Sequence, residues 1–118
     1  MEYGLSSKTL NTIRNILRSH PEVEVAILFG SRAKGTYKPG SDIDLSLVGA
    51  NLSHQILLRI MSEFDDSSIP YLVDLSMFDQ IGDAAVRSHI QRKGQILYQK
   101  ETEVPVPGRW YFRAGTSK

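Results

Sequence analysis

The sequence Leu-Phe-Gly-Ser at residues 28–31, followed ten residues later by Asp-Ile-Asp-Leu at residues 42–45, decides the fold of this chain. The first piece ends a run over residues 23–29 that is polar at first and apolar by its end, which predicts a strand. The second piece opens residues 43–48, where apolar and polar residues alternate with the period of two of a strand. Glycines and a proline lie between them. We therefore expect two strands joined by a loop.

Further regular segments lie on either side of this pair of strands. Residues 7–19 and 54–65 have apolar residues at helical spacing, each after a serine that can cap a helix start. Residues 71–76 alternate like the second strand, and residues 82–93 predict a third helix that ends near Gly94. This order predicts an α+β (mixed α/β) fold with a small mixed sheet. We expect helices on one side of the sheet only, with the aspartate-bearing side open.

Length and composition limit the class of protein. The chain has 118 residues, so we expect one domain over residues 1–100 and, because of its prolines and glycines, an irregular tail over residues 101–118. A net charge of +1 argues against direct nucleic-acid binding. No cysteine is present, which excludes thiolate metal sites. No apolar run approaches the roughly 20 residues of a membrane span, and no secretion signal begins the chain. We expect a cytoplasmic protein.

Three aspartates define a candidate metal site. Asp42 and Asp44 are two residues apart, so their side chains lie on one face of the second strand. Asp74 has a comparable position in the third strand, and the three carboxylates converge if these strands are neighbours. Like charges at about 4 Å repel by several kcal/mol at an effective dielectric near 20, so such a group binds protons or a cation. Oxygen donors without sulfur or paired histidines favour Mg²⁺ or Mn²⁺.

The turn after the first strand is a candidate phosphate site. Gly30 allows the backbone to approach a ligand, and Ser31 can open a short helix whose amides face an anion. Arg32 and Lys34 add positive charge. A phosphate site beside a carboxylate metal site is what nucleotide chemistry requires. The sequence therefore predicts that these four residues bind a nucleotide.

Simpler interpretations of the same residues compete with this one. A nucleoside-triphosphatase P-loop is excluded because Thr36 stands where that loop needs lysine. A calcium-binding loop is excluded because Leu47 stands where it needs glycine. Asp42 as a turn cap and Asp44 as a solvated residue remain a sufficient explanation of the Asp-x-Asp pair taken alone. The glycine–serine turn and Asp74 together favour the functional interpretation.

The two-part motif resembles the signature of the polymerase-beta-type nucleotidyltransferase superfamily, and the short chain resembles its minimal, stand-alone branch. The resemblance covers about residues 10–98. It implies the nucleotidyltransferase palm fold. It also implies roles for five residues, which are triphosphate binding by Gly30 and Ser31, metal binding by Asp42 and Asp44, and a third, catalytic carboxylate at Asp74.

The same resemblance implies an activity and a partner. The reaction is transfer of a nucleoside monophosphate, AMP from ATP, to a hydroxyl acceptor, with two metal ions during turnover. Minimal members resemble antitoxins paired with an all-helical HEPN-domain toxin, and some are similar to enzymes that adenylylate a toxin tyrosine, which implies a hetero-oligomer. Two alternatives stay open: an inactive module that neutralises a partner by occlusion, and transfer to a small molecule. The aromatic cluster at residues 109–113 suggests that the tail docks a partner.

Overall fold

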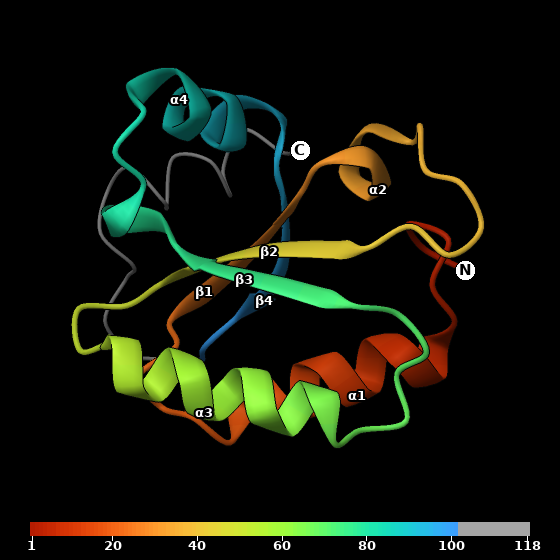
Figure 1. Cartoon of the computed structure of the whole chain (residues 1–118), viewed down its shortest axis with the longest axis horizontal. Helices are drawn as coiled ribbons and strands as arrows, with labels where there is room; N and C mark the ends of the chain where they lie inside the picture. The colour runs from red at the N-terminus through yellow and green to blue at the C-terminus, as the bar shows by residue number, and fades with distance from the viewer. Residues whose placement is uncertain (102–118) are drawn as a thin grey trace.

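Four strands form one mixed sheet in the computed structural model, which describes residues 1–101 (Figure 1). The strand order is β3-β2-β1-β4. β1 pairs antiparallel with both β2 and β4, and β2 pairs parallel with β3. The predicted α+β class is confirmed, and so is the expectation that the two aspartate-bearing strands are neighbours. The strands are β1 Val25–Phe29, β2 Ile43–Val48, β3 Val73–Met77 and β4 Gln95–Gln99.

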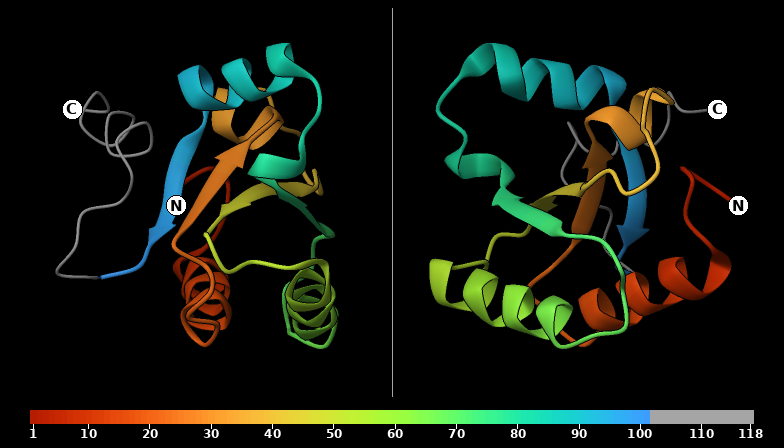
Figure 2. Two further views of the ribbon diagram at one scale, coloured as in Figure 1. Left: turned by 90° about the vertical axis from the view of Figure 1, so that its left-hand side faces the viewer. Right: turned by 45° about the vertical axis from the view of Figure 1, so that its right-hand side comes forward.

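Helices cover both faces of this sheet. α1 and α3 lie side by side against one face, which we call the α1/α3 face, and α4 lies against the other, which we call the α4 face (Figure 2). The short α2 follows β1 directly, and a 3-10 turn, η1, follows β3. The helical elements are α1 Ser7–Arg18, α2 Ser31–Lys34, α3 His54–Asp65, η1 Phe78–Gln80 and α4 Ala84–Lys93.

Polar side chains cap three of the helices, and the two serine caps are at the predicted places. Ser6 and Ser53 precede α1 and α3, and each side chain accepts a hydrogen bond from a backbone amide three residues on. Asp83 does the same at the start of α4, from an amide two residues on. Such caps satisfy amides that have no partner within the helix. The predicted helix starts are confirmed to within two residues.

The larger part of the core lies on the α1/α3 face. Leu45 and Leu47 of β2 point into it beside Leu28 of β1, and all three are at most 1% exposed. Ile13 of α1 and Ile60 of α3, neither of them exposed, close the layer from below. Both helices are amphipathic, and burial of their apolar faces against the sheet is a large favourable term in folding.

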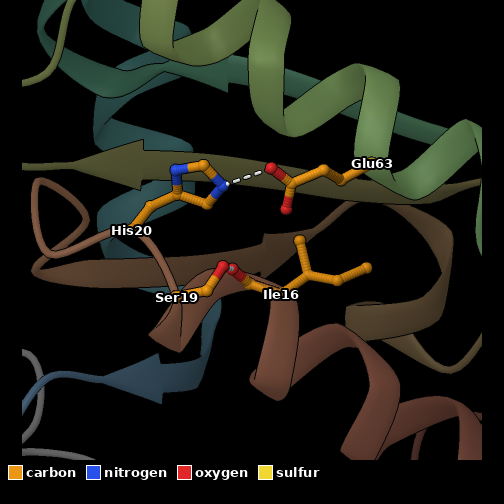
Figure 3. A network of polar contacts seen from close by, with 4 residues as sticks. All are labelled: Ile16, Ser19, His20 and Glu63. Atoms are coloured by element: carbon orange, nitrogen blue, oxygen red, sulfur yellow. Dashed lines mark hydrogen bonds and ion pairs between the residues drawn. The ribbon is translucent and has the colours of Figure 1, made fainter.

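A partly buried polar pair joins the two helices of this layer. His20, just after α1, is 8% exposed, and its Nε2 lies 2.9 Å from Oε2 of Glu63 on α3 (Figure 3). One residue earlier, the hydroxyl of Ser19 donates to the Ile16 carbonyl at 2.7 Å and satisfies the end of α1. The end of α1 is thus fixed to α3 by a specific contact as well as by apolar packing.

The α4 face shows that the prediction of helices on one side was wrong. Val25 and Ile27 of β1 point to this face and pack with Phe78 of η1 and Ile90 of α4. Because β1 is apolar on both faces, a second covering helix is needed to keep it from water. The alternation in β2 indicated that one face of the sheet is open. The apolar residues on both faces of β1 show that both faces of the sheet must be covered.

Two smaller differences lie toward the carboxyl end. The third strand begins at Val73, two residues later than predicted, and the apolar piece after Gly94 forms β4. The predicted tail spans residues 101–118, and all of it except Glu101 lies outside the described part of the chain, so its docking role stays a prediction. Within residues 1–101, no helix combines the length and apolarity that crossing a membrane requires.

Candidate active site

Asp44 and Asp74 are the centre of the candidate site. They are register partners on the adjacent parallel strands β2 and β3. Asp44 alternates with Ile43 and Leu45, which point into the α1/α3 core, so both aspartates belong to the α4 face. Asp42 immediately precedes β2 and is exposed. The fold thus brings the carboxylates of two separate strands together, as the sequence predicted.

The charges of these carboxylates act on one another. Burial raises the pKa of the Asp44 carboxyl, and the negative charges of Asp74 and Asp42 raise that pKa further. Each of the three causes disfavours the ionised form of Asp44. A cation bound between the carboxylates would remove the repulsion, and carboxylate oxygens are the ligands that Mg²⁺ prefers. The donor set therefore fits a hard divalent ion.

The three aspartate side chains are nevertheless not arranged as a complete metal site. Across the described residues 1–101, no three aspartate, glutamate, histidine or cysteine side chains lie close enough together to hold a metal ion. The register places Asp44 beside Asp74, and Asp42 lies at the entrance to β2. Full coordination would need side-chain rotation, with remaining ligands from substrate phosphates, which is the usual way in which Mg²⁺ is bound.

Gly30 is required where the site meets the first turn. Its φ of 76° and ψ of −155° belong to a region that is essentially restricted to glycine. A Cβ at this position would stand 2.4 Å from Oδ2 of Asp44, a contact that no side chain could make without displacing the carboxylate. The backbone at Gly30 therefore passes directly against Asp44, and the two halves of the sequence motif meet in space.

Ser31 and Lys34 begin and end the short helix α2. Ser31 is half-buried next to Gly30, and Lys34 is exposed. The amide of Lys34 donates to the Gly30 carbonyl at 3.1 Å, which closes the single turn. The predicted order of strand, glycine turn and helix start is present, and Ser31 directly follows the glycine whose backbone lies against Asp44.

Arg32 has a different position from the one predicted. It is 3% exposed, and its guanidinium nitrogens donate to the backbone carbonyls of Tyr3 and Ser41 at 2.8–3.1 Å. The same group lies over the rings of Tyr37 and Tyr71, 5.3 and 4.5 Å from their centres. A structural role therefore replaces the predicted phosphate contact, because this guanidinium ties the amino terminus and the 35–41 loop to the start of β3.

Ser46 and Ser76 lie next to the aspartates of the candidate site, and reasoning from the sequence did not single them out. They are register partners, two residues beyond the aspartates on the same face of the same strands. Their hydroxyl oxygens are buried and have no hydrogen-bond partner among residues 1–101. The signal was present in the sequence, since alternation places them on the aspartate face, but burial of that face under α4 was not foreseen.

Comparison with known proteins identifies the class. The Polymerase beta, Nucleotidyltransferase family matches residues 11–103, which is most of the chain. The chain belongs to this family, and the resemblance found in the two-part motif is confirmed.

Individual relatives narrow the comparison. A probable protein adenylyltransferase, MntA, of Haemophilus influenzae is 27% identical over 107 residues, 90% of this chain and 93% of that protein. A crystal structure of a toxin–antitoxin with AMP-PNP is similar with a TM-score of 0.66 and 22% identity, over 92% of this chain and 83% of that one. A complex of a tri-AMPylated Shewanella oneidensis HEPN toxin with its MNT antitoxin is similar with a TM-score of 0.61 and 19% identity, over 81% of this chain and 74% of that one. At these identities the solved structures establish the fold.

Proposed function

We propose that this protein is a Mg²⁺-dependent adenylyltransferase that transfers AMP from ATP to a hydroxyl group of a partner protein. The observation that carries the proposal is the in-register pair Asp44 and Asp74, with the backbone of Gly30 against Asp44. Membership of the nucleotidyltransferase family supports the reaction class. The similarity to a probable protein adenylyltransferase supports AMP as the group and protein as the acceptor.

Each proposed site residue has a distinct task. Asp42, Asp44 and Asp74 would hold Mg²⁺ or Mn²⁺, two ions during turnover, which would supply charge neutralisation at the phosphates and lower the pKa of an acceptor hydroxyl. Gly30 and Ser31 would contact the triphosphate, because glycine lets the backbone come close and Ser31 opens α2. Lys34, exposed at the end of α2, would add positive charge for the phosphates.

The reaction is a displacement at the α-phosphorus of ATP. The acceptor oxygen forms a bond to that phosphorus, the bond to the bridging oxygen of the β-phosphate breaks, and pyrophosphate leaves. The acceptor loses its hydroxyl proton in the same process. Asp74 is exposed at the edge of the sheet, where an acceptor can reach it, and would receive this proton.

A protein acceptor would add contacts of its own to a site that lies on an exposed sheet edge. Within residues 1–101, the site lies at a sheet edge beside the cluster under α4, where a partner protein can approach Asp74. Relatives of the same fold are found in complexes of MNT antitoxins with HEPN toxins. We therefore propose a tyrosine of an all-helical HEPN-type toxin as the acceptor, with the protein acting as its antitoxin in a hetero-oligomer.

The test is AMP transfer with defined partners. The full-length protein is incubated with α-labelled ATP, Mg²⁺ and a candidate HEPN-type partner, which we expect to be encoded nearby, and label on the partner is located by mass spectrometry. We expect a gain of one AMP per modified tyrosine, which disappears with chelator. The paired variant Asp42→Asn with Asp44→Asn should reduce the rate about a thousandfold, since metal-based charge stabilisation contributes several kcal/mol.

The contrary outcomes separate the alternatives. Neutralisation of the toxin without any label, unchanged in the paired variant, would show that the protein acts by occlusion. Pyrophosphate release with a small hydroxyl compound and no protein would show a small-molecule transferase. Either result would overturn the proposed function.

A further inference from the structure

Four polar side chains form a rectangle on the α4 face of β2 and β3. Asp44 is opposite Asp74, and Ser46 is opposite Ser76. Strand geometry gives this rectangle sides of about 4.8 Å across the strands and about 6.6 Å along them. One end carries two carboxylates, and the other end carries two hydroxyls.

The hydroxyl end of the rectangle is shielded from solvent. Ser46 is 0% exposed, and its register partner on β1 is Ile27, which packs in a cluster with Phe78 and Ile90. Neither Ser46 nor Ser76 hydroxyl has a hydrogen-bond partner within the described chain. Buried hydroxyls in native proteins are almost always paired, with protein groups or with ordered water. The side chains of this cluster are apolar and carry no hydrogen-bonding group.

We propose that one buried water molecule binds at the centre of this rectangle and fixes the orientation of both carboxylates. It accepts a hydrogen bond from each serine hydroxyl and donates one to an oxygen of Asp44 and one to an oxygen of Asp74. All four hydrogen bonds of the water are then used, within the two to four that buried waters make. The centre lies about 4 Å from each corner Cα in the plane of the sheet, within reach of short side chains.

Ser46 and Ser76 are therefore positioning residues. By holding one oxygen of each carboxylate toward the water, they leave the other oxygen of Asp44 and Asp74 directed to the ion. This consequence rests on the proposed function, whereas the water site itself does not. Groups that hydrogen-bond to metal ligands typically change metal affinity by about 10- to 100-fold when they are removed.

The first test is crystallographic and needs neither metal nor substrate. A high-resolution crystal structure of the full chain should show a water within hydrogen-bond distance of both serine oxygens and both aspartates. In the variant Ser46→Ala with Ser76→Ala, the water should be lost, and Asp44 and Asp74 should adopt more than one conformer. Serine hydroxyls that donate to backbone carbonyls, with no water between the strands, would overturn the proposal.

The second test measures Mn²⁺ binding by calorimetry in the absence of ATP and partner. We expect the double alanine variant to bind Mn²⁺ about tenfold more weakly than the parent protein. Ser76→Thr keeps the hydroxyl and should bind like the parent. Ile27→Val removes a methylene group beside Ser46 and serves as the packing control, with unchanged affinity expected.

The results also distinguish this proposal from the proposed function. Parent-like Mn²⁺ affinity in the double alanine variant would overturn the positioning role, even if AMP transfer is observed. A bound water together with Mn²⁺ affinity that depends on the serines would support the proposal, even if no AMP reaches any partner. The absence of AMP transfer would overturn only the proposed function.

Discussion

The two faces of the sheet differ in the residues that they carry: one is apolar throughout, and the other is partly apolar and partly polar. On the α1/α3 face, apolar side chains of all four strands meet two amphipathic helices in a continuous core. On the α4 face, a small cluster that includes Ile27, Phe78 and Ile90 covers one part, and polar residues occupy the neighbouring part. The same strand, β2, presents Leu45 and Leu47 to one face and Asp44 and Ser46 to the other.

This difference shows how a domain of this size can contain a row of acidic and hydroxyl groups. The carboxylates gain nothing from burial, since both burial and their mutual repulsion raise the pKa of Asp44. The continuous core on the opposite face supplies the hydrophobic free energy that holds the strands in register. Only a few apolar contacts under α4 are then needed to complete the fold beside the site.

The largest expected effect separates the stability contributions of the two faces. Leu45→Ala removes a fully buried side chain from the α1/α3 core and should lower the free energy of unfolding by about 2–5 kcal/mol. Ile90→Ala removes a side chain of similar volume from the smaller cluster and should cost less, about 2 kcal/mol, because α4 can settle toward the sheet. Urea unfolding measures both. An equal or larger loss for Ile90→Ala would contradict the comparison.

The second prediction concerns the contact between the first turn and the acidic row. Gly30→Ala should lower stability by about 1–3 kcal/mol because of its backbone conformation, and should reduce AMP transfer about a hundredfold by displacing Asp44. Gly35→Ala is the matched control. Gly35 also has a positive φ, of 83°, but beyond its chain neighbours no atom lies within 4 Å of the place that a Cβ would take.

Gly35→Ala should therefore lose stability, by about 1–2 kcal/mol, and keep its activity. The two variants are compared by urea unfolding and by the rate of label transfer. Similar rates in the two variants would show that the close approach of Gly30 to Asp44 has no part in the reaction.

Local sequence patterns determined much of what could be predicted. The bounds of α3 are those predicted, because its apolar spacing and the cap at Ser53 are both local signals. The pairing of Asp44 with Asp74 followed from alternation, once β2 and β3 proved to be neighbours. The motif at residues 28–45 was also local, and it indicated the candidate site and the family from sequence alone.

What could not be predicted depends on residues that are distant in the chain. Arg32 is buried because Tyr3 and Tyr71, which lie 29 and 39 positions away, come together around it (32 − 3 and 71 − 32). The position of α4 follows from the apolar second face of β1, some 60 residues earlier in the chain, which no periodicity within α4 reveals. Polar residues that become buried by such contacts, as Ser46 does, look solvent-facing in the sequence.

The third prediction tests the structural role of Arg32, which bonds and stacks on residues at the start of the chain, in the 35–41 loop and before β3. Arg32→Lys keeps the charge but loses the planar group that bonds two backbone carbonyls and stacks on two tyrosines. We expect a loss of about 1–2 kcal/mol in unfolding free energy and little change in the KM for ATP. A KM raised tenfold or more at unchanged stability would instead show that Arg32 contacts phosphate.

The smallest expected effect is a gain in stability from removing the charge of Asp44. Because the pKa of Asp44 is raised in the folded protein, the folded state binds this proton more tightly than the unfolded chain does. Below pH 3.8, the ordinary pKa of an aspartate, Asp44 is protonated in both states and its contribution to stability is at its maximum. This contribution is lost as the pH rises through the raised pKa of the folded protein. At pH 7 the ionised Asp44 carboxyl therefore destabilises the fold. Asp44→Asn should raise the melting temperature by a few degrees at pH 7, and this advantage should disappear as the pH falls toward 3.8.

Added Mg²⁺ gives the complementary measurement at constant pH. An ion between Asp44 and Asp74 would stabilise the folded parent protein by binding only that state, so its melting temperature should rise with Mg²⁺ concentration. Asp44→Asn should show a weaker rise, and Glu101→Gln, at an exposed position, should respond like the parent. If Asp44→Asn instead melts at a lower temperature than the parent protein at pH 7 without Mg²⁺, Asp44 stabilises the fold. The proposed difference between a stabilising α1/α3 face and a destabilising acidic row on the α4 face would then be wrong.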